Sequence, residues 1–192
     1  MSINKALKRL GYTREWLDYG IITTEYLIAQ HLEIESSEDQ NAEHYRCGAF
    51  EDFLKSKAAL TETDIVNIFK LKDDGPDLCD LHIDRIHSLI YSGILNDNQL
   101  LSLNSYPEVT EAPLQKLYNR ECLIRKINEL GIEACFCDIK QSNDPNIHKY
   151  ILNLPELELN HINWLSKNST NKKVRNIATQ LSNSKKYRTS AT

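Results

Sequence analysis

Apolar side chains recur every three or four residues along most of this 192-residue chain, and that spacing constrains its fold more than any other feature. An α-helix places residues at this spacing on one face, so each such segment predicts a helix with one buried side. Only six glycines and five prolines interrupt the pattern, too few for the many turns of an all-β protein. The sequence therefore predicts an all-α fold of about ten helices joined by short loops.

Capping residues indicate where several of these helices begin. Ser2 precedes a helix that we expect to reach Leu10, and Thr23 precedes another. Thr61 and Asp64 have the spacing of a capping box, in which two side chains accept hydrogen bonds from each other's backbone. Ser37 and Asp97 are expected to cap two more helices, and Pro113 is expected in the first turn of another. Gly11 and Gly131 are expected to end helices. Gly75 and Pro76 break the pattern before a helix over residues 78–91, and residues 133–139 are expected to be a strand or an extended segment.

The length of the chain fits one domain or at most two small ones. We expect a single helical domain over residues 1–184. Residues 185–192 are expected to fray, because the last residues of a domain are often poorly ordered.

One helix near the C-terminus has a specific pattern. Val174, Ile177, Ala178 and Leu181 recur at i, i+3, i+4 and i+7, which predicts a buried stripe. With Arg175, the pattern V-R-x-x-A-x-x-L resembles the second helix of a HEAT-type repeat, and residues 159–170 resemble the first. The resemblance implies that the apolar side chains face a neighbouring repeat. The sequence shows no fixed repeat period, so the expectation is an irregular or short HEAT-like helical stack.

Charge is distributed unevenly along the chain. The net charge is −4, but the last 27 residues carry seven basic and no acidic side chains, which leaves −11 on residues 1–165. Thirteen acidic and five basic residues lie between Glu33 and Asp80. Such an acidic body repels phosphate backbones and attracts basic partners. The expected partner-binding residues are Glu33, Glu35, Glu38, Asp39, Glu43, Glu51, Asp52, Asp73, Asp74 and Asp77.

Three arginines fall on or beside the apolar faces of their helices. They are Arg46, Arg85 and Arg125. His82 lies on the same apolar helix face as Arg85. A buried charge must be paired, so we expect another helix to supply a carboxylate to Arg85. On their own helices, Glu43 can pair with Arg46 at i, i+3, and Glu121 with Arg125 at i, i+4. The alternative is a cleft in which the three arginines bind an anion.

A polar cluster forms a second candidate site. Asp80, Asp84, His87 and Tyr91 follow a helical spacing and would share one face, where two carboxylates and an imidazole could hold a divalent metal or perform acid–base chemistry. The alternative is a solvated helix face.

The five cysteines match no standard metal motif. Cys135 and Cys137 have no second cysteine pair and no histidine at finger spacing, so we expect no metal and no cofactor. The odd number of cysteines and the missing secretion signal favour reduced thiols in the cytoplasm. No apolar run is long enough to span a membrane.

The favoured interpretation is a non-catalytic module that binds a basic protein through its acidic face. A chain of this kind resembles, in general type, a bacterial immunity or inhibitor protein that neutralises a basic toxin such as a nuclease. Two alternatives remain open. One is a HEAT-like protein that binds nucleic acid through its basic C-terminal end, and the other is a metal-dependent enzyme that uses Asp80, Asp84 and His87.

Overall fold

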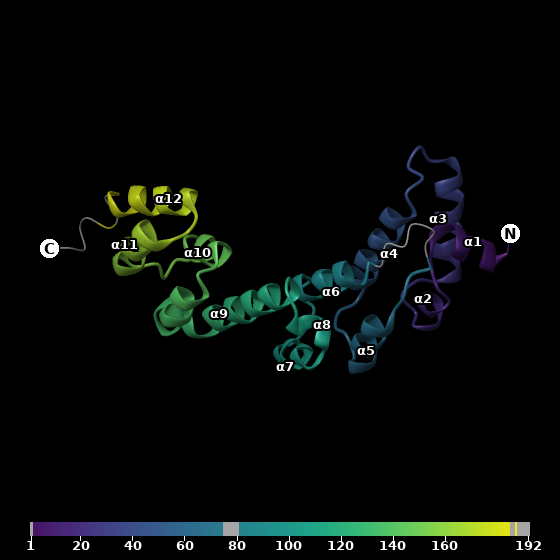
Figure 1. Cartoon of the computed structure of the whole chain (residues 1–192), viewed down its shortest axis with the longest axis horizontal. Helices are drawn as coiled ribbons and strands as arrows, with labels where there is room; N and C mark the ends of the chain where they lie inside the picture. Colours follow the sequence, from purple (N-terminus) through teal and green to yellow (C-terminus); the bar gives the residue numbers. More distant parts are fainter. Residues whose placement is uncertain (1, 75–80, 185–186, 188–192) are drawn as a thin grey trace. The chain divides into compact units, whose positions relative to one another are not determined.

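The structure is a computed structural model that describes residues 2–74, 81–184 and 187. These residues form twelve α-helices, one short 3-10 helix and no β-strand, which confirms the all-α prediction (Figure 1). The helices are α1 (Ile3–Leu10), α2 (Glu15–Asp18), α3 (Thr24–Ser36), α4 (Ala42–Ser56), α5 (Glu62–Lys70), α6 (His82–Tyr91), α7 (Asp97–Ser102), η1 (Leu103–Ser105), α8 (Pro107–Thr110), α9 (Leu114–Ser142), α10 (Pro145–Ile151), α11 (Leu159–Asn168) and α12 (Lys172–Ser182).

The chain divides into two compact units, Met1–Leu117 and Tyr118–Thr192. Eleven basic and twenty acidic side chains give the first unit a net charge of −9. Twelve basic and seven acidic side chains give the second unit a net charge of +5. The uneven charge of the sequence thus follows a structural division. The expectation of a single domain over residues 1–184 stays a prediction.

The predicted frayed tail lies outside the described residues except at one position. Tyr187 is buried, and its hydroxyl donates a hydrogen bond to the Leu157 carbonyl at 3.0 Å. Tyr187 therefore packs into the hydrophobic core of the second unit.

Several predicted helix ends are confirmed. The Ser2 side chain accepts a hydrogen bond from the Lys5 backbone, and Gly11 closes α1 with a φ of 70° that favours glycine. Thr61 and Asp64 form the expected capping box of α5. At these ends the sequence signal is local, so tertiary packing does not alter it.

Two predicted helix starts are wrong. Ser37 follows α3 as its C-cap, and α4 begins only at Ala42, with Asn41 as its N-cap. The residues between the two helices form a loop that contains Glu38 and Asp39. Asp97 is the first residue of α7, and Asn96 caps that helix through a capping box with Gln99.

Residues 133–139 are helical, so the expectation of a strand or extended segment is wrong. Gly131, with φ 83° and ψ 167°, interrupts α9 as predicted, and a second helical stretch follows at once. Ile132, Cys135 and Ile139 are fully buried at i, i+3 and i+7 in the core of the second unit. The burial of one helical face therefore outweighs the strand preference of the isoleucine and phenylalanine side chains.

Helices α11 and α12 pack against each other as a helical hairpin. Val174 and Ala178 are buried, but Ile177 is 36% exposed, so the predicted stripe is wrong at that position. Arg175 Nη1 donates to the Ser169 carbonyl at 2.6 Å, which links the start of α12 to the end of α11. Membership of the HEAT-type repeats stays a prediction.

In the first unit, one carboxylate lies between two buried arginines. Asp73 Oδ2 is 2.5 Å from Arg85 Nη1, and Asp73 Oδ1 is 3.4 Å from Arg46 Nε. All three side chains are at most 3% exposed. The prediction that the buried Arg85 is paired is therefore confirmed. The expected pair of Arg46 with Glu43 is not formed, because Arg46 turns toward Asp73 instead.

Both arginines also bind backbone carbonyls. Arg46 Nη1 donates to Leu10 at the end of α1 at 2.7 Å, and Arg85 Nη2 donates to Leu71 at 2.9 Å. The neighbouring Lys72 carbonyl accepts from the indole of Trp16 at 3.1 Å. These contacts fasten the segment after α5 to α2, α4 and α6, and Arg46 extends the connection to the end of α1.

We predict that Asp73→Ala costs about 3–5 kcal/mol of the free energy of unfolding of the first unit, because two buried guanidinium groups lose their shared carboxylate. Asp74→Ala is the matched control, since Asp74 is exposed and its side chain has no hydrogen bond among the described residues. Its cost should stay within about 0.5 kcal/mol. The measurement is urea denaturation followed by Trp16 fluorescence in a Trp164→Phe background. Equal costs at both aspartates would contradict the prediction.

Candidate functional site

Most of the predicted partner-binding acids are exposed and lie on one helix–loop–helix segment. Glu33 and Glu35 are on α3, Glu51 and Asp52 are on α4, and the loop between these helices carries two more acids. The exposed acids of the predicted set are Glu33, Glu35, Glu38, Asp39, Glu51, Asp52 and Asp74, whereas Glu43 is half-buried. Asp77 lies outside the described residues.

Asp73 does not belong to this exposed set. Its side chain is 2% exposed and is held by Arg46 and Arg85. The prediction that Asp73 contacts a partner is therefore wrong. The physical reason is that two buried arginines require a carboxylate. Asp73 supplies it and is therefore buried rather than exposed at the surface.

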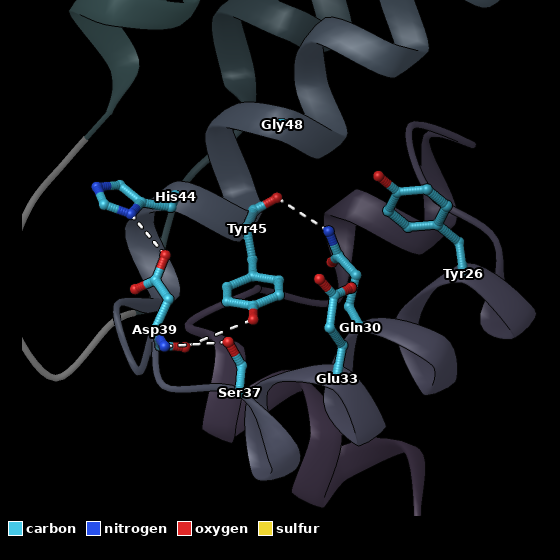
Figure 2. A pocket seen from close by; sticks show the side chains of 8 residues that line it. All are labelled: Tyr26, Gln30, Glu33, Ser37, Asp39, His44, Tyr45 and Gly48. Atoms are coloured by element: carbon cyan, nitrogen blue, oxygen red, sulfur yellow. Dashed lines mark hydrogen bonds and ion pairs between the residues drawn. The ribbon is translucent and has the colours of Figure 1, made fainter.

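A pocket of about 340 Å³ opens between α3 and α4 (Figure 2). From α3 and its C-cap it is lined by Tyr26, Gln30, Glu33 and Ser37, which follow one another at i, i+4, i+7 and i+11 and so share a face of the helix. Its other residues are Asp39, His44, Tyr45 and Gly48. The pocket therefore combines two carboxylates with two aromatic rings.

Hydrogen bonds hold the base of this pocket. Tyr12 donates to the side-chain oxygen of Gln30 at 2.6 Å. The Gln30 amide donates to the Tyr45 carbonyl at 3.0 Å (Figure 2). Burial raises the pKa of Tyr12, so its hydroxyl remains a donor. Tyr12, in the loop after α1, and Gln30 thereby connect α3 to α4. These buried hydrogen bonds hold in place the helices that carry the pocket side chains.

The two carboxylates of the pocket differ in their partners. Asp39 Oδ2 lies 2.9 Å from His44 Nδ1, whereas the Glu33 side chain has no hydrogen bond or ion pair with any described residue. The hydrogen bond between Asp39 and His44 raises the pKa of the imidazole and lowers the pKa of the carboxyl group. Glu33 thus presents an uncompensated negative charge to the pocket.

Tyr26 lies at one end of the pocket and is held by Asp52. Its hydroxyl donates to Asp52 Oδ2 at 2.8 Å. Burial, followed by this hydrogen bond, raises the pKa of Tyr26 to about 12. The hydroxyl is therefore protonated at neutral pH and does not serve as a base.

Ser37, Asp39 and His44 are the residue types of a nucleophile, an orienting acid and a base. No hydrogen bond joins His44 to Ser37 in the structure, and Figure 2 shows the His44 ring turned toward Asp39 and away from Ser37. The Ser37 hydroxyl instead accepts from the Asp39 backbone amide at 3.0 Å. These three residues do not form a catalytic relay in this arrangement.

The other predicted clusters are only partly assembled. Asp84 and His87 are exposed on α6, and the His87 ring lies 5.1 Å from that of Tyr91, while Asp80 lies outside the described residues. In the parts of the chain that the structure describes, no three histidine, cysteine or acidic side chains gather closely enough to hold a metal ion. Cys135 is buried and Cys137 is exposed, and both are free thiols.

The three arginines of the predicted anion cleft belong to different units. Arg46 and Arg85 meet at Asp73 in the first unit. Arg125 lies in the second unit, where its Nε is 3.2 Å from Glu121 Oε1, as the i, i+4 spacing predicted. The structure thus brings together two of the three, around a carboxylate.

Comparison with known proteins adds no family: no family model, no curated protein and no solved structure matches this chain. Within residues 2–74 and 81–184, no helix has both the length and the apolar character needed to cross a bilayer.

Sequence reasoning found Glu33 and Asp39 but missed the rest of the pocket. Tyr26, Gln30 and Glu33 form a polar and aromatic stripe on α3, and this spacing was the available signal. Tyr45 and Gly48 gave no such signal, because their role depends on where α4 lies relative to α3.

We predict that the pKa of His44 falls toward its ordinary value of 6.5 in Asp39→Asn, because the variant loses a charged hydrogen-bond acceptor. Since the folded-state pKa of His44 is raised, the stabilisation from this pair is complete below 6.5 and is lost as the pH rises through the raised value. NMR titration of the imidazole resonances measures both effects. Glu43→Gln is the control and should shift the pKa less. An unchanged His44 pKa in Asp39→Asn would refute the assignment.

Proposed function

We propose that this chain is a non-catalytic protein-binding module whose acidic first unit binds a cationic partner protein. The observation that carries the proposal is the α3–α4 pocket. There Glu33 has no partner among the described residues, and five further exposed acids of the predicted set lie on the same helix–loop–helix segment. A lysine or arginine of the partner would compensate this charge.

The charge of the whole unit supports the same partner. With a net charge of −9, the first unit attracts a basic protein over the distance of a Debye length, about 8 Å at physiological ionic strength. Complementary charge raises the association rate and discriminates against acidic proteins. Binding should therefore weaken steeply as salt is added.

A small acidic binding protein of this kind is of the type that blocks basic toxins, and an immunity or inhibitor protein is the specific form of the proposal. Nucleases present cationic surfaces to phosphate groups. The carboxylates of α3, α4 and their connecting loop would occupy such a surface in place of phosphates. In this form the toxin is the partner, and the chain needs no catalytic group of its own.

We predict that immobilised wild-type chain retains basic proteins from a lysate of its source organism at low salt. The double variant Glu33→Lys/Glu38→Lys should lose them, because the like charges of variant and partner would then repel. Retained proteins are quantified by mass spectrometry at two salt concentrations. Asp73 is unsuitable for charge reversal, since a lysine between Arg46 and Arg85 would unfold the unit.

The matched control is Glu111→Lys, which reverses an exposed acid of the same unit away from the α3–α4 segment. It should retain the same basic proteins as the wild type. Retention by the double variant, or equal loss in the control, would remove the support for an acidic site on α3 and α4.

The second candidate function is nucleic-acid binding by the second unit. Lys167, Lys172 and Lys173 are exposed and form no ion pair with any described residue. Lys172 and Lys173 occupy the first turn of α12, where the helix dipole disfavours cations. An anionic ligand such as a phosphate backbone would offset this unfavourable placement.

Random-sequence duplex DNA tests this candidate. If the second unit binds nucleic acid, the affinity falls with salt, and Lys172→Glu/Lys173→Glu weakens it roughly tenfold or more. Lys149→Glu is the control, since Lys149 is exposed on α10. Binding by wild type and by Lys172→Glu/Lys173→Glu with equal affinity would exclude α12 as the contact.

A further inference from the structure

A second depression of about 260 Å³ lies beyond Tyr26, between the same two helices. It is mainly apolar and is lined by Ile21, Ile22, Thr23, Tyr26, Ala49, Asp52, Phe53 and Ser56. Tyr26 lines both hollows, and its hydrogen bond to Asp52 spans the helices between them. The two hollows therefore lie on either side of the Tyr26–Asp52 hydrogen bond, and together they are named the α3–α4 groove, with an acidic part and an apolar part.

The order of the lining residues sets the direction of this groove. The acidic part joins the end of α3 to the start of α4, and the apolar part joins the start of α3 to the end of α4. The helices thus run antiparallel along the groove. The α4 residues of the two parts are centred about seven positions apart, so their separation is roughly 10 Å at a rise of 1.5 Å per residue.

The open shape of the two parts, more than their size, favours side chains over a whole metabolite. Pockets for small molecules usually enclose about 300–1,000 Å³ and most of the ligand. Here two hollows of about 340 and 260 Å³ lie in line and are open to one side, as suits successive side chains of a peptide. Charge complementarity selects the peptide: Glu33, which has no partner among the described residues, favours a cation, and the ring of Tyr26 at the edge of the acidic part suits a guanidinium group.

Gly48 supplies an independent indication of a bound segment. It lies in the middle of α4, where glycine destabilises a helix by about 0.5–1 kcal/mol relative to alanine. A Cβ atom at this position would meet nothing within 4 Å, so packing inside the unit does not require glycine. Gly48 faces the acidic part (Figure 2), and the space beside its backbone is available to a partner.

We propose that the α3–α4 groove binds a peptide segment of a basic protein, with an arginine or lysine in the acidic part and an aliphatic side chain in the apolar part. This inference rests on the proposed function, since it names the segment by which the cationic partner is recognised. Seven residues of a helix span roughly 10 Å and place the two side chains on one face. On an extended chain, side chains share a face only at even separations, so two or four positions, about 6.6 or 13 Å, are the nearest matches. The partner segment therefore carries the two side chains at one of these spacings.

The test uses fluorescein-labelled peptides with one arginine and one leucine in a glycine–serine background, separated by one to eight positions. Fluorescence polarisation with the full chain should give the tightest binding at a separation of two, four or seven, where the two side chains share a face of an extended or helical segment. A peptide without leucine should bind more weakly. Gly48→Leu fills the groove and should weaken the best peptide roughly tenfold or more. Glu33→Gln should weaken arginine peptides and leave leucine-only peptides unchanged.

The controls separate blocked binding from loss of fold. Gly48→Ala should keep most of the affinity and raise the melting temperature, because it improves the helix without filling the groove. Gly48→Leu should also unfold no earlier than the wild type. Glu111→Gln removes a distant charge and should change the peptide affinity little.

Three results would contradict the proposal that the α3–α4 groove binds a peptide. The first is an affinity that depends on peptide charge and salt but not on the arginine–leucine separation, and the second is an unchanged affinity in Gly48→Leu. The third is salt-sensitive dimerisation of the chain that Glu33→Lys abolishes, since the second unit of another copy would then be the occupant. The proposed function would survive the first two if the lysate experiment still retained basic proteins. It would fall separately if that experiment retained none.

Discussion

The first unit depends on the charge balance around Asp73. Arg46 and Arg85 are both at most 3% exposed, and each would be unstable in the interior without an anion. Asp73 supplies it from the segment after α5, and the arginines then reach backbone carbonyls at Leu10 and Leu71. Through Leu10, Arg46 fixes α4 against α1, which also packs on α3. The separation of α3 and α4, and hence the groove between them, follows from this arrangement.

Carboxylate side chains therefore have two different roles in the first unit. Inside, Asp73 is fully desolvated and paired, and its charge contributes to the fold. Outside, Glu33 remains solvated, without a partner among the described residues, and its charge is available for recognition. Both residues were equal members of one acidic set in the sequence. Their different roles arise from burial, because a charge that is removed from water must be compensated where it lies.

The α3–α4 groove departs in two ways from what stability alone favours. Glycine at position 48 weakens α4, and the uncompensated Glu33 adds repulsion to a unit that is already strongly negative. A partner with a basic and an aliphatic side chain would occupy the space beside Gly48, and its basic side chain would neutralise Glu33. Local rules that are broken without a gain in the isolated fold are expected at functional sites.

The sequence by itself determined the helical class of this protein and several of its helix ends. The 3.6-residue period established the all-α class, Ser2, Gly11 and the Thr61–Asp64 box defined helix ends, and the i, i+4 spacing paired Glu121 with Arg125, because these depend on neighbours within a turn or two. It also established the excess of acids before residue 80 and of bases at the end. Only the tertiary structure decided that Asp73 is buried and that residues 133–139 are helical. It also brought Tyr26, Tyr45 and Gly48 around the carboxylates of α3 and its loop. Those outcomes depend on which surfaces are buried against segments far away in the chain, and burial outweighs local preference wherever a charge must be paired or an apolar face covered.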